Sequence, residues 1–183
     1  MRKDLGEKLN FMPLPVLMIG TYDENGNANL MNAAWGGIYD YNEVIISLSP
    51  HKTTKNLELK KAFTLSFATK DTVVESDYFG MVSGNKEDKI KRANFHAIKS
   101  KFVDAPVFEE YPLTLECKVK SFEAGTLIGE IANASIDEKY LDKNGKIDVE
   151  KIGFISFDMI TNSYRLVGQK VGNAFQDGLK LKR

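Results

Sequence analysis

Cysteine is almost absent from this sequence, and its single cysteine, Cys117, excludes several classes of protein. One cysteine forms no internal disulfide and no CxxC redox or zinc site, and an iron–sulfur cluster within one chain needs several. The stretch around it, residues 115–119, alternates apolar and polar side chains, which predicts a small inward-facing side chain on a strand. Histidine is also scarce, and His51 and His96 are not clustered, so we expect no metal site. We expect His96 to be partly buried and hydrogen-bonded.

An excess of charge of either sign is also lacking, since 25 Lys and Arg residues balance 25 Asp and Glu residues. Basic residues form no stripe interleaved with aromatic side chains, so we expect no nucleic-acid partner. No apolar run reaches the length of a membrane span, and residues 1–11 are too polar for a signal peptide. We therefore expect a cytoplasmic protein with no membrane partner, folded as one domain over residues 1–183.

Glycine-rich nucleotide motifs are missing too, and strands do not alternate regularly with helices, which disfavours a doubly wound dinucleotide fold. Apolar and alternating runs instead predict strands at residues 16–22, 28–33, 44–49, 62–68, 113–122, 127–136 and 155–160. Helices are predicted at residues 3–9, 52–61, 73–81 and 87–93, and Asn25-Gly26 marks a hairpin turn. This pattern predicts a mainly β protein, an antiparallel barrel or sandwich with inserted helices.

Three of these segments carry more detailed expectations. Val73, Val74, Asp77 and Tyr78 are spaced to share one face of the 73–81 helix. In the 113–122 strand, Thr114, Glu116, Lys118 and Lys120 alternate with apolar residues and should form a solvent-facing side. Residues 39–43 are expected to be a turn, and residues 96–103 are expected to be irregular.

Residues 29–56 combine features that suit a flat, phosphorylated ligand. A run of small residues containing one Trp, at 32–37, lets a planar ring approach the backbone closely. The strand at 44–49 then leads into a helix start with Lys52, Thr53 and Thr54, which offers free N–H groups, hydroxyls and a cation. Each feature has a plainer structural explanation: Gly36-Gly37 as a loop or sheet bend, Thr53 or Thr54 as the helix N-cap, and Lys52 as a surface charge. The order of the features favours the ligand site.

Several ordered motifs resemble the flavin reductase-like, FMN-binding split-barrel family, and its flavoredoxin branch in particular. They include Pro13-x-Pro15-Val16-Leu17, Asp23-x-x-Gly26-x-x-Asn29, Asn32-x-Ala34-Trp35, Ser49 before Lys52-Thr53-Thr54-Lys55-Asn56-Leu57, Ser83-Gly84 before Asp88-Lys89, and Tyr164-Arg165-Leu166-Val167-Gly168 before Gly172-Asn173-Ala174-Phe175. The similarity spans nearly the whole chain. It implies an antiparallel FMN-binding split barrel, a noncovalently bound FMN, and a homodimer whose partner subunit closes part of the site.

The resemblance also implies which residues hold the cofactor. Asn32, Ala33, Ala34 and Trp35 would lie along the isoalloxazine ring, Ser47, Leu48 and Ser49 beneath it, and Lys52, Thr53 and Thr54 at the phosphate. Ser83 and Lys89 are further candidates for the phosphate end, and Phe175 for the ring or the dimer seam. His51 stands where the family often has Arg; it is either a phosphate donor or a surface turn residue.

The leading functional expectation from the sequence is an NAD(P)H-dependent, FMN-containing oxidoreductase, in which the flavin carries the redox chemistry. No catalytic side chain is assigned, and NAD(P)H would stack over the exposed ring, near Tyr39 or Tyr41. The alternative is a flavoredoxin-type electron carrier that passes electrons between redox partner proteins without using NAD(P)H. A third reading is a non-catalytic split barrel, ligand-binding or structural, whose flavin site is vestigial. No short motif separates the first two.

Overall fold

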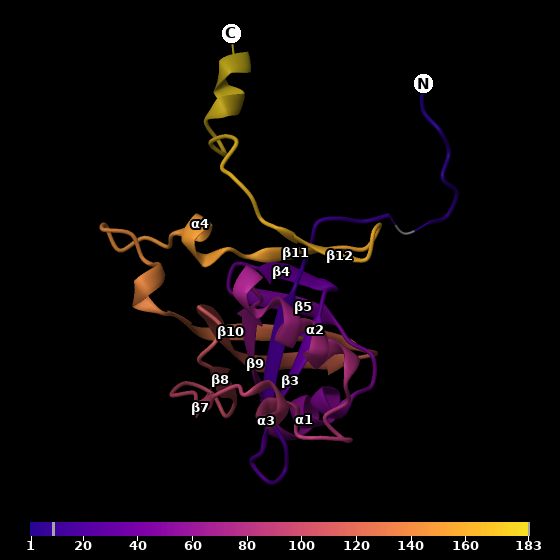
Figure 1. Cartoon of the computed structure of the whole chain (residues 1–183), viewed down its shortest axis with the longest axis vertical. Coiled ribbons are helices and arrows are strands. Elements are labelled where there is room, and N and C mark those ends of the chain that lie inside the picture. The colour runs from indigo at the N-terminus through magenta and orange to yellow at the C-terminus, as the bar shows by residue number, and fades with distance from the viewer. Residues whose placement is uncertain (9, 183) are drawn as a thin grey trace.

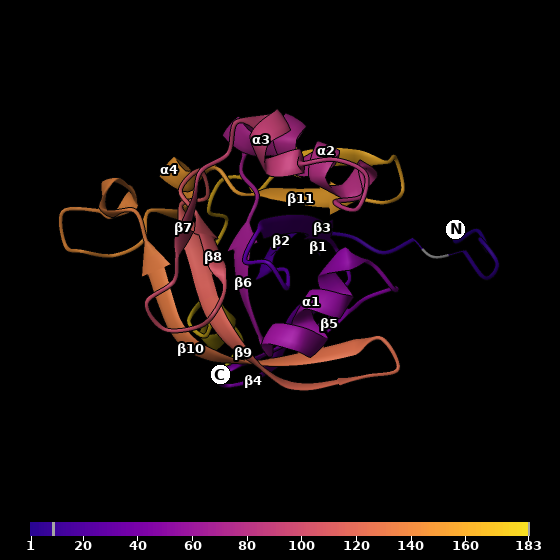
Figure 2. The same ribbon diagram turned by 90° about the horizontal axis from the view of Figure 1, so that it is seen from below.

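Seven antiparallel strands form the main sheet of the computed structural model, which describes residues 1–8 and 10–182 (Figure 1). Their order across the sheet is β3 (Ala28–Ala33), β2 (Leu17–Tyr22), β6 (Ala62–Phe67), β9 (Leu113–Glu123), β10 (Thr126–Ile136), β5 (Glu43–Ser47) and β4 (Gly36–Asp40). The two edge strands, β3 and β4, are consecutive in the chain and separated by Ala34 and Trp35 alone. A sheet whose edges are joined by so short a link must curl, and Figure 2 shows this curl. The antiparallel split barrel expected from the sequence is confirmed, with its opening between β3 and β4.

Smaller elements surround the main sheet. A three-stranded sheet has the order β1 (Leu14–Pro15), β11 (Ile155–Asp158) and β12 (Ser163–Leu166), and β7 (Ala97–Lys99) pairs with β8 (Pro106–Phe108). The helices are α1 (Lys52–Lys60), α2 (Val73–Met81), α3 (Lys89–Ala93) and α4 (Val149–Ile152), with 3-10 turns η1 (Lys70–Thr72), η2 (Glu138–Tyr140) and η3 (Asp177–Leu181). Among the described residues, no helix combines the length and apolar character needed to cross a membrane.

The core lies on both faces of β2. Leu17 and Ile19 point into one apolar cluster, which contains Leu57 of α1 and Phe63 of β6. The alternate residue Met18 points into a second cluster, and Val16, just before the strand, joins it there with Phe79 of α2. A strand buried on both faces explains why residues 16–22 read as a nearly continuous apolar run. Cys117 of β9 is fully buried in the first cluster, which confirms its expected role as an apolar side chain.

The two longest predicted helices are confirmed, but two details of them are wrong. The N-cap of α1 is His51 rather than Thr53 or Thr54, because the Thr54 hydroxyl sits at the third helical position and turns back to the cap. In α2, Val74 is 74% exposed, whereas Ser76 and Phe79 are the buried residues. The helix therefore packs on a face shifted from the one expected, and Val73 and Tyr78 lie at the border of the second cluster.

Three local expectations are corrected by the structure. Residues 3–8 form no helix, and Leu9, the last residue of that expected helix, lies outside the described residues. The expected turn at 39–43 shrinks to Tyr41-Asn42, because Gly36–Asp40 extends as β4 along β5. Residues 96–103 contain the short strand β7, which pairs with β8 through contacts that the sequence pattern does not reveal.

The solvent-facing side expected for β9 is wrong for its first half. Thr114 and Glu116 are both buried, and partners from other segments satisfy them. Ser66 and Thr114 share a hydrogen bond of 2.8 Å, Asn133 Nδ2 donates to Glu116 Oε1 at 2.6 Å, and Ser100 Oγ donates to Glu116 Oε2. His96, expected to be partly buried, has an exposed side chain instead. Its expected hydrogen bond is present, since its Nδ1 lies 2.7 Å from Glu110 Oε1.

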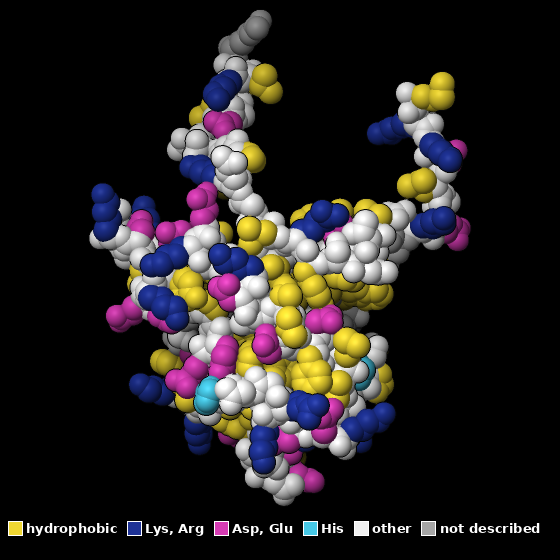
Figure 3. All heavy atoms as spheres, in the orientation of Figure 1, with side chains coloured by type: hydrophobic (Ala, Val, Ile, Leu, Met, Phe, Trp, Pro, Cys, Tyr) yellow, Lys and Arg dark blue, Asp and Glu magenta, His cyan; other side chains and the backbone are white. Residues whose placement is uncertain are grey.

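Both ends of the chain extend from the body (Figure 1). In the C-terminal segment, residues 168–182, Val171 is 100% exposed and Phe175 is 99% exposed. Figure 3 shows both segments standing away from the body, with hydrophobic side chains gathered on the same face below them. A segment with such apolar side chains in solvent is a candidate for contact with another chain.

Candidate functional site

The N-terminus of α1 forms the floor of the candidate site. His51 has an extended backbone at the cap, and its N–H donates to Thr54 Oγ1 at 3.0 Å. The Thr54 hydroxyl in turn donates to the His51 carbonyl at 2.9 Å, so this side chain is occupied within the cap itself. The Thr53 hydroxyl accepts a hydrogen bond of 2.9 Å from Asn29 Nδ2. The first-turn N–H groups carry the positive end of the helix dipole, and no acidic residue in that turn opposes it.

Two lysines lie at this helix start: Lys52 is the first residue of α1, and Lys89 comes from α3. Lys52 Nζ is 3.1 Å from Asp23 Oδ2 and donates to the Gly84 carbonyl at 3.5 Å. Lys89, from the first turn of α3, is 5% exposed, and its Nζ donates to the Phe79 carbonyl at 2.9 Å. An ammonium group has three donors, and Lys89 has no second hydrogen-bond partner among the described residues, although its Nζ also lies 5.9 Å from the centre of the Phe79 ring. Two N–H groups are therefore available to an anion.

Burial and charge act on Lys89 in a way that suits an anion site. Burial, with the neighbouring charge of Lys52 as a second cause, lowers the pKa of its ammonium to about 8, while Glu87 acts in the opposite direction. An anion placed between Lys52 and Lys89 would relieve their repulsion and favour the charged lysine. The pair is therefore suited to hold a group with at least one negative charge.

The turn after α2 brings backbone close to these cations. A Cβ on Gly84 would lie 2.3 Å from Asn29 Oδ1 and 3.3 Å from Lys52 Cδ, so only glycine lets this turn approach so closely. Ser83, next to it, is exposed, and its hydroxyl accepts a weak hydrogen bond of 3.3 Å from the Asn85 N–H.

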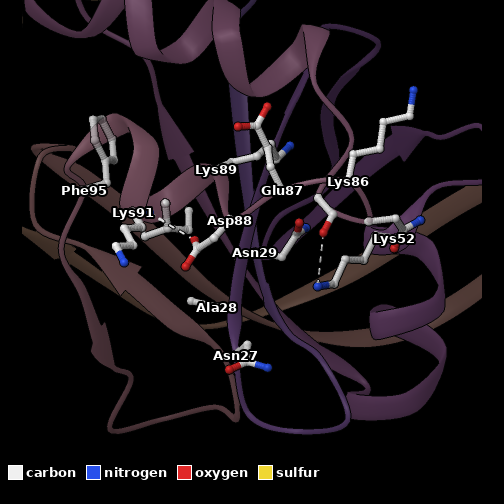
Figure 4. A pocket seen from close by; sticks show the side chains of 13 residues that line it. Asn27, Ala28, Asn29, Lys52, Lys86, Glu87, Asp88, Lys89, Lys91 and Phe95 are labelled. Atoms are coloured by element: carbon white, nitrogen blue, oxygen red, sulfur yellow. Dashed lines mark hydrogen bonds between the residues drawn. The ribbon is translucent and has the colours of Figure 1, made fainter.

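Two adjoining cavities lie over these residues. The smaller, about 180 Å³, is lined by residues that include six of the predicted site residues: Asn32, His51, Lys52, Thr53, Ser83 and Lys89. The larger, about 640 Å³, shares four lining residues with it, namely Asn29, Lys52, Gly84 and Lys89. Figure 4 shows this larger cleft, with Asn29 between Lys52 and Lys89 in that view. The smaller cavity is thus the more enclosed of the two, and its lining combines Lys52 and Lys89 with no acidic side chain.

The remaining predicted residues lie around this centre or apart from it. Ala33 and Ala34 are partly buried at the barrel opening, and Trp35 is 57% exposed, its carbonyl accepting from the Ser47 N–H at 2.8 Å. Leu48 and Ser49 line a third cavity of about 830 Å³, together with His51, Thr54 and the β9–β10 turn. Phe175 belongs to the extended C-terminal segment and is not gathered with the others within this chain.

A model of the flavin reductase like domain matches residues 9–149. This chain belongs to the flavin reductase-like family. The match covers every predicted site residue except Phe175. Its resemblance to the family, proposed from the ordered motifs, is confirmed.

Two flavoredoxins are among the solved structures that resemble this flavin reductase-like chain over nearly its full length. The flavoredoxin of Desulfovibrio vulgaris (Miyazaki F) is 32% identical, with a TM-score of 0.93, covering 97% of this chain and 100% of its own. The flavoredoxin of Methanosarcina acetivorans is 29% identical, with a TM-score of 0.89, covering 99% of each chain. Nitrilotriacetate monooxygenase component B of Bacillus cereus, at 18% identity and a TM-score of 0.79, covering 94% of this chain and 98% of its own, shares the fold alone.

Sequence reasoning missed some residues that shape the site of this flavin reductase-like chain. Asn29 is buried, donates a hydrogen bond to the Thr53 hydroxyl and lines both adjoining cavities. It was not predicted as a site residue, although it is the last residue of the Asp23-x-x-Gly26-x-x-Asn29 motif. That motif was a usable signal. The close approach of Gly84 had no comparable signal, because it depends on Asn29, which lies far away in the sequence.

Proposed function

We propose that this chain binds FMN noncovalently and acts as an electron carrier of flavoredoxin type, passing electrons between redox partner proteins. The observation that carries the binding proposal is the convergence of Lys52, Lys89 and the start of α1 on one enclosed cavity. The carrier role rests on similarity to two flavoredoxins along almost the entire chain.

The residues present fit the phosphate of FMN. Lys89 is buried with two N–H groups free, Lys52 lies beside it, and Gly84 leaves room for a close approach. A phosphate dianion can take charge-assisted hydrogen bonds from both lysines and from the helix N–H groups. The Thr54 hydroxyl would contribute indirectly, by holding the cap in place.

The rest of the predicted set would hold the flavin ring at the barrel opening. The small side chains of Ala33 and Ala34 leave space there for a flat ring, and Trp35 could cover its edge. When bound, the flavin supplies the redox chemistry, while the protein orients it and sets its surroundings. Lys52 and Lys89 bind its phosphate, and Asn32 lies at the border between the phosphate cavity and the opening.

The comparisons support the carrier, which the sequence left as the alternative, better than the NAD(P)H-dependent reductase. The experiment that separates them is anaerobic addition of NADH or NADPH to the FMN-loaded protein, followed by dithionite. A carrier keeps its flavin absorption with either pyridine nucleotide and loses it with dithionite. Fast bleaching by NADH or NADPH would instead establish the reductase.

A further inference from the structure

The turn between β2 and β3 is closed by the side chain of Asp23. Its Oδ1 accepts hydrogen bonds from the backbone N–H groups of Asn25 at 3.0 Å and Asn27 at 2.9 Å. Two backbone–backbone bonds complete the turn: the Asp23 N–H donates to the Asn27 carbonyl at 3.0 Å, and the Gly26 N–H donates to the Asp23 carbonyl at 3.1 Å. The backbone of the turn thus uses one carboxylate oxygen, Oδ1, and does not use Oδ2.

The turn that begins at Asp142 has the same construction at an exposed position. Asp142 Oδ1 accepts from the backbone N–H groups of Asn144 at 2.7 Å and Lys146 at 2.9 Å, and the same pair of backbone–backbone bonds closes the turn. Its fourth residue, Gly145, has a positive φ, as Gly26 has in the first turn. Asp142 forms no ion pair among the residues that the structure describes. A turn of this kind therefore needs no cation at the second carboxylate oxygen.

In Asp23, this second oxygen faces the candidate site. Asp23 Oδ2 lies 3.1 Å from Lys52 Nζ, and the Asp23 side chain is only 12% exposed. Asn27 Nδ2 donates to the same oxygen at 3.3 Å. Burial acts to raise the pKa of Asp23, but the hydrogen bonds from Asn25, Asn27 and Lys52 hold this pKa below its usual value. The carboxylate is therefore ionised at neutral pH and binds the Lys52 ammonium.

This ion pair holds Lys52 where the two adjoining cavities meet. Lys52 Nζ also donates to the Gly84 carbonyl at 3.5 Å, and Lys52 lines both cavities. An ammonium group has three donors, so Asp23 and Gly84 leave one of them for an anion. A lysine side chain is flexible, and a contact that orders it in advance removes the entropy cost of ordering it when a ligand binds.

We propose that Asp23 is a positioning residue, which holds Lys52 in place for the phosphate of the ligand. That this phosphate belongs to FMN rests on the proposed function, whereas the hold of Asp23 on Lys52 does not. A carboxylate beside an anion site repels a phosphate. Its position there is explained if the ordering of Lys52 outweighs the repulsion. The two effects have opposite signs, so an experiment can separate them.

Asp23→Asn separates ordering from repulsion. The oxygen of the new side chain must accept from the two turn N–H groups, so its NH₂ faces Lys52 Nζ and two donors meet. Asparagine forms the same kind of turn, so the fold is kept while Lys52 loses its acceptor. FMN affinity should fall by roughly threefold to tenfold, the cost of ordering one flexible side chain, although the loss of a negative charge alone would raise it. Asp142→Asn, the same change in the matching turn, should leave the affinity unchanged.

The loss of affinity should also depend on Lys52. Fluorescence titrations with FMN compare Asp23→Asn in the wild-type protein and in Lys52→Ala, where the added change should weaken binding no further. An unchanged or higher affinity in Asp23→Asn would overturn the positioning role. An equal loss with and without Lys52 would overturn it too, because the effect would then not act through the lysine.

The hold on Lys52 is measured without ligand in the same proteins. In ¹H–¹⁵N spectra of lysine ammonium groups, Lys52 should give a signal, because an ammonium bound to a nearly buried carboxylate exchanges its hydrogens slowly with water; Lys52→Ala assigns it. Asp23→Asn should remove this signal and Asp142→Asn should keep it. A wild-type protein without the signal, or a signal that persists in Asp23→Asn, would overturn the proposal. A wild-type protein that binds no FMN would overturn the proposed function and the role of Asp23 towards FMN, while the ammonium signal would still decide whether Asp23 holds Lys52.

Discussion

At the scale of single residues, the buried charge of Lys89 destabilises the fold but suits the binding of an anion. Its ammonium is buried with one hydrogen bond, and burial lowers its pKa from 10.5 to about 8. Between these two values the unfolded chain binds more protons than the folded one, so the unfavourable contribution is complete below pH 8 and fades towards pH 10.5. An isolated fold would be more stable without this charge. Its position beside Lys52 is explained if an anion normally accompanies it.

We therefore expect Lys89→Met to raise Tm at pH 7 and to weaken FMN binding by roughly tenfold or more, since hydrogen bonds to charged groups are strong. Thermal melts at pH 7 and FMN fluorescence titrations measure the two effects. Lys91→Met, at an exposed position of the same cleft, is the control and should alter neither by much. A Lys89→Met protein with lower Tm and wild-type FMN affinity would contradict this role.

Cys117 gives a second test at the residue scale. Burial raises the pKa of its thiol to about 12, and the neighbouring Glu116 adds to the effect. Since the thiolate is the reactive form, the folded protein should resist thiol-specific disulfide reagents at pH 8 and react fully after unfolding in urea. Rapid labelling without denaturant would mean that β9 opens far more readily than its buried position indicates.

At the scale of elements, β10 depends on a glycine to fit its neighbour. A Cβ on Gly129 would lie 2.4 Å from Phe63 Cζ, in the centre of the first apolar cluster. Gly129→Ala should lower the free energy of unfolding by about 1–3 kcal/mol, the usual range for overpacking, as measured by urea denaturation. Gly37→Ala in β4 is the control, because a Cβ there meets nothing within 4 Å. Equal losses in both variants would show that strand propensity, and not the contact with Phe63, decides the effect.

Sequence patterns predicted most elements because their apolar periodicity records burial directly. The strands β2, β3, β5 and β6 and the helices α1 and α2 were all recognised in this way. The pattern failed where distant partners decide the outcome: Glu116 alternates like a solvent-facing residue but is buried with Ser100 and Asn133. Likewise, Gly36 reads as part of a loop or a sheet bend, and only the structure shows that it begins β4, where a Cβ would come 2.8 Å from the Ile45 carbonyl.

The candidate site likewise contains features that the sequence revealed and features that only the structure revealed. The helix start and its lysine were recognisable because cap, cation and hydroxyls are neighbours in the sequence. The role of Thr54 was not, since its hydroxyl is occupied by the cap rather than free for a ligand. The hydrogen bonds that join Asn32 to Ser76 and Tyr164 to Asp77 were beyond sequence reasoning, because each of them joins distant segments.

At the scale of the whole molecule, we propose that the extended C-terminal segment packs against a second copy of the chain. Val171 and Phe175 would be exposed to solvent in a monomer, and the resemblance to the family implies a homodimer. We expect a dimer by light scattering, and Phe175→Asp or removal of residues 168–183 should shift it towards monomer by exposing the seam. Gln176→Asp is the matched control and should stay dimeric. A monomeric wild-type protein, or a dimer unaffected by truncation, would contradict this assignment.

The most direct test of the central claim is a visible absorption spectrum after incubation with FMN and desalting. The cradle formed by Lys52, Lys89 and the start of α1 predicts two-band flavin absorption retained by the wild-type protein and lost or sharply reduced in a Lys52→Ala, Lys89→Met double variant. A colourless wild-type protein, or a double variant that retains FMN equally well, would contradict it.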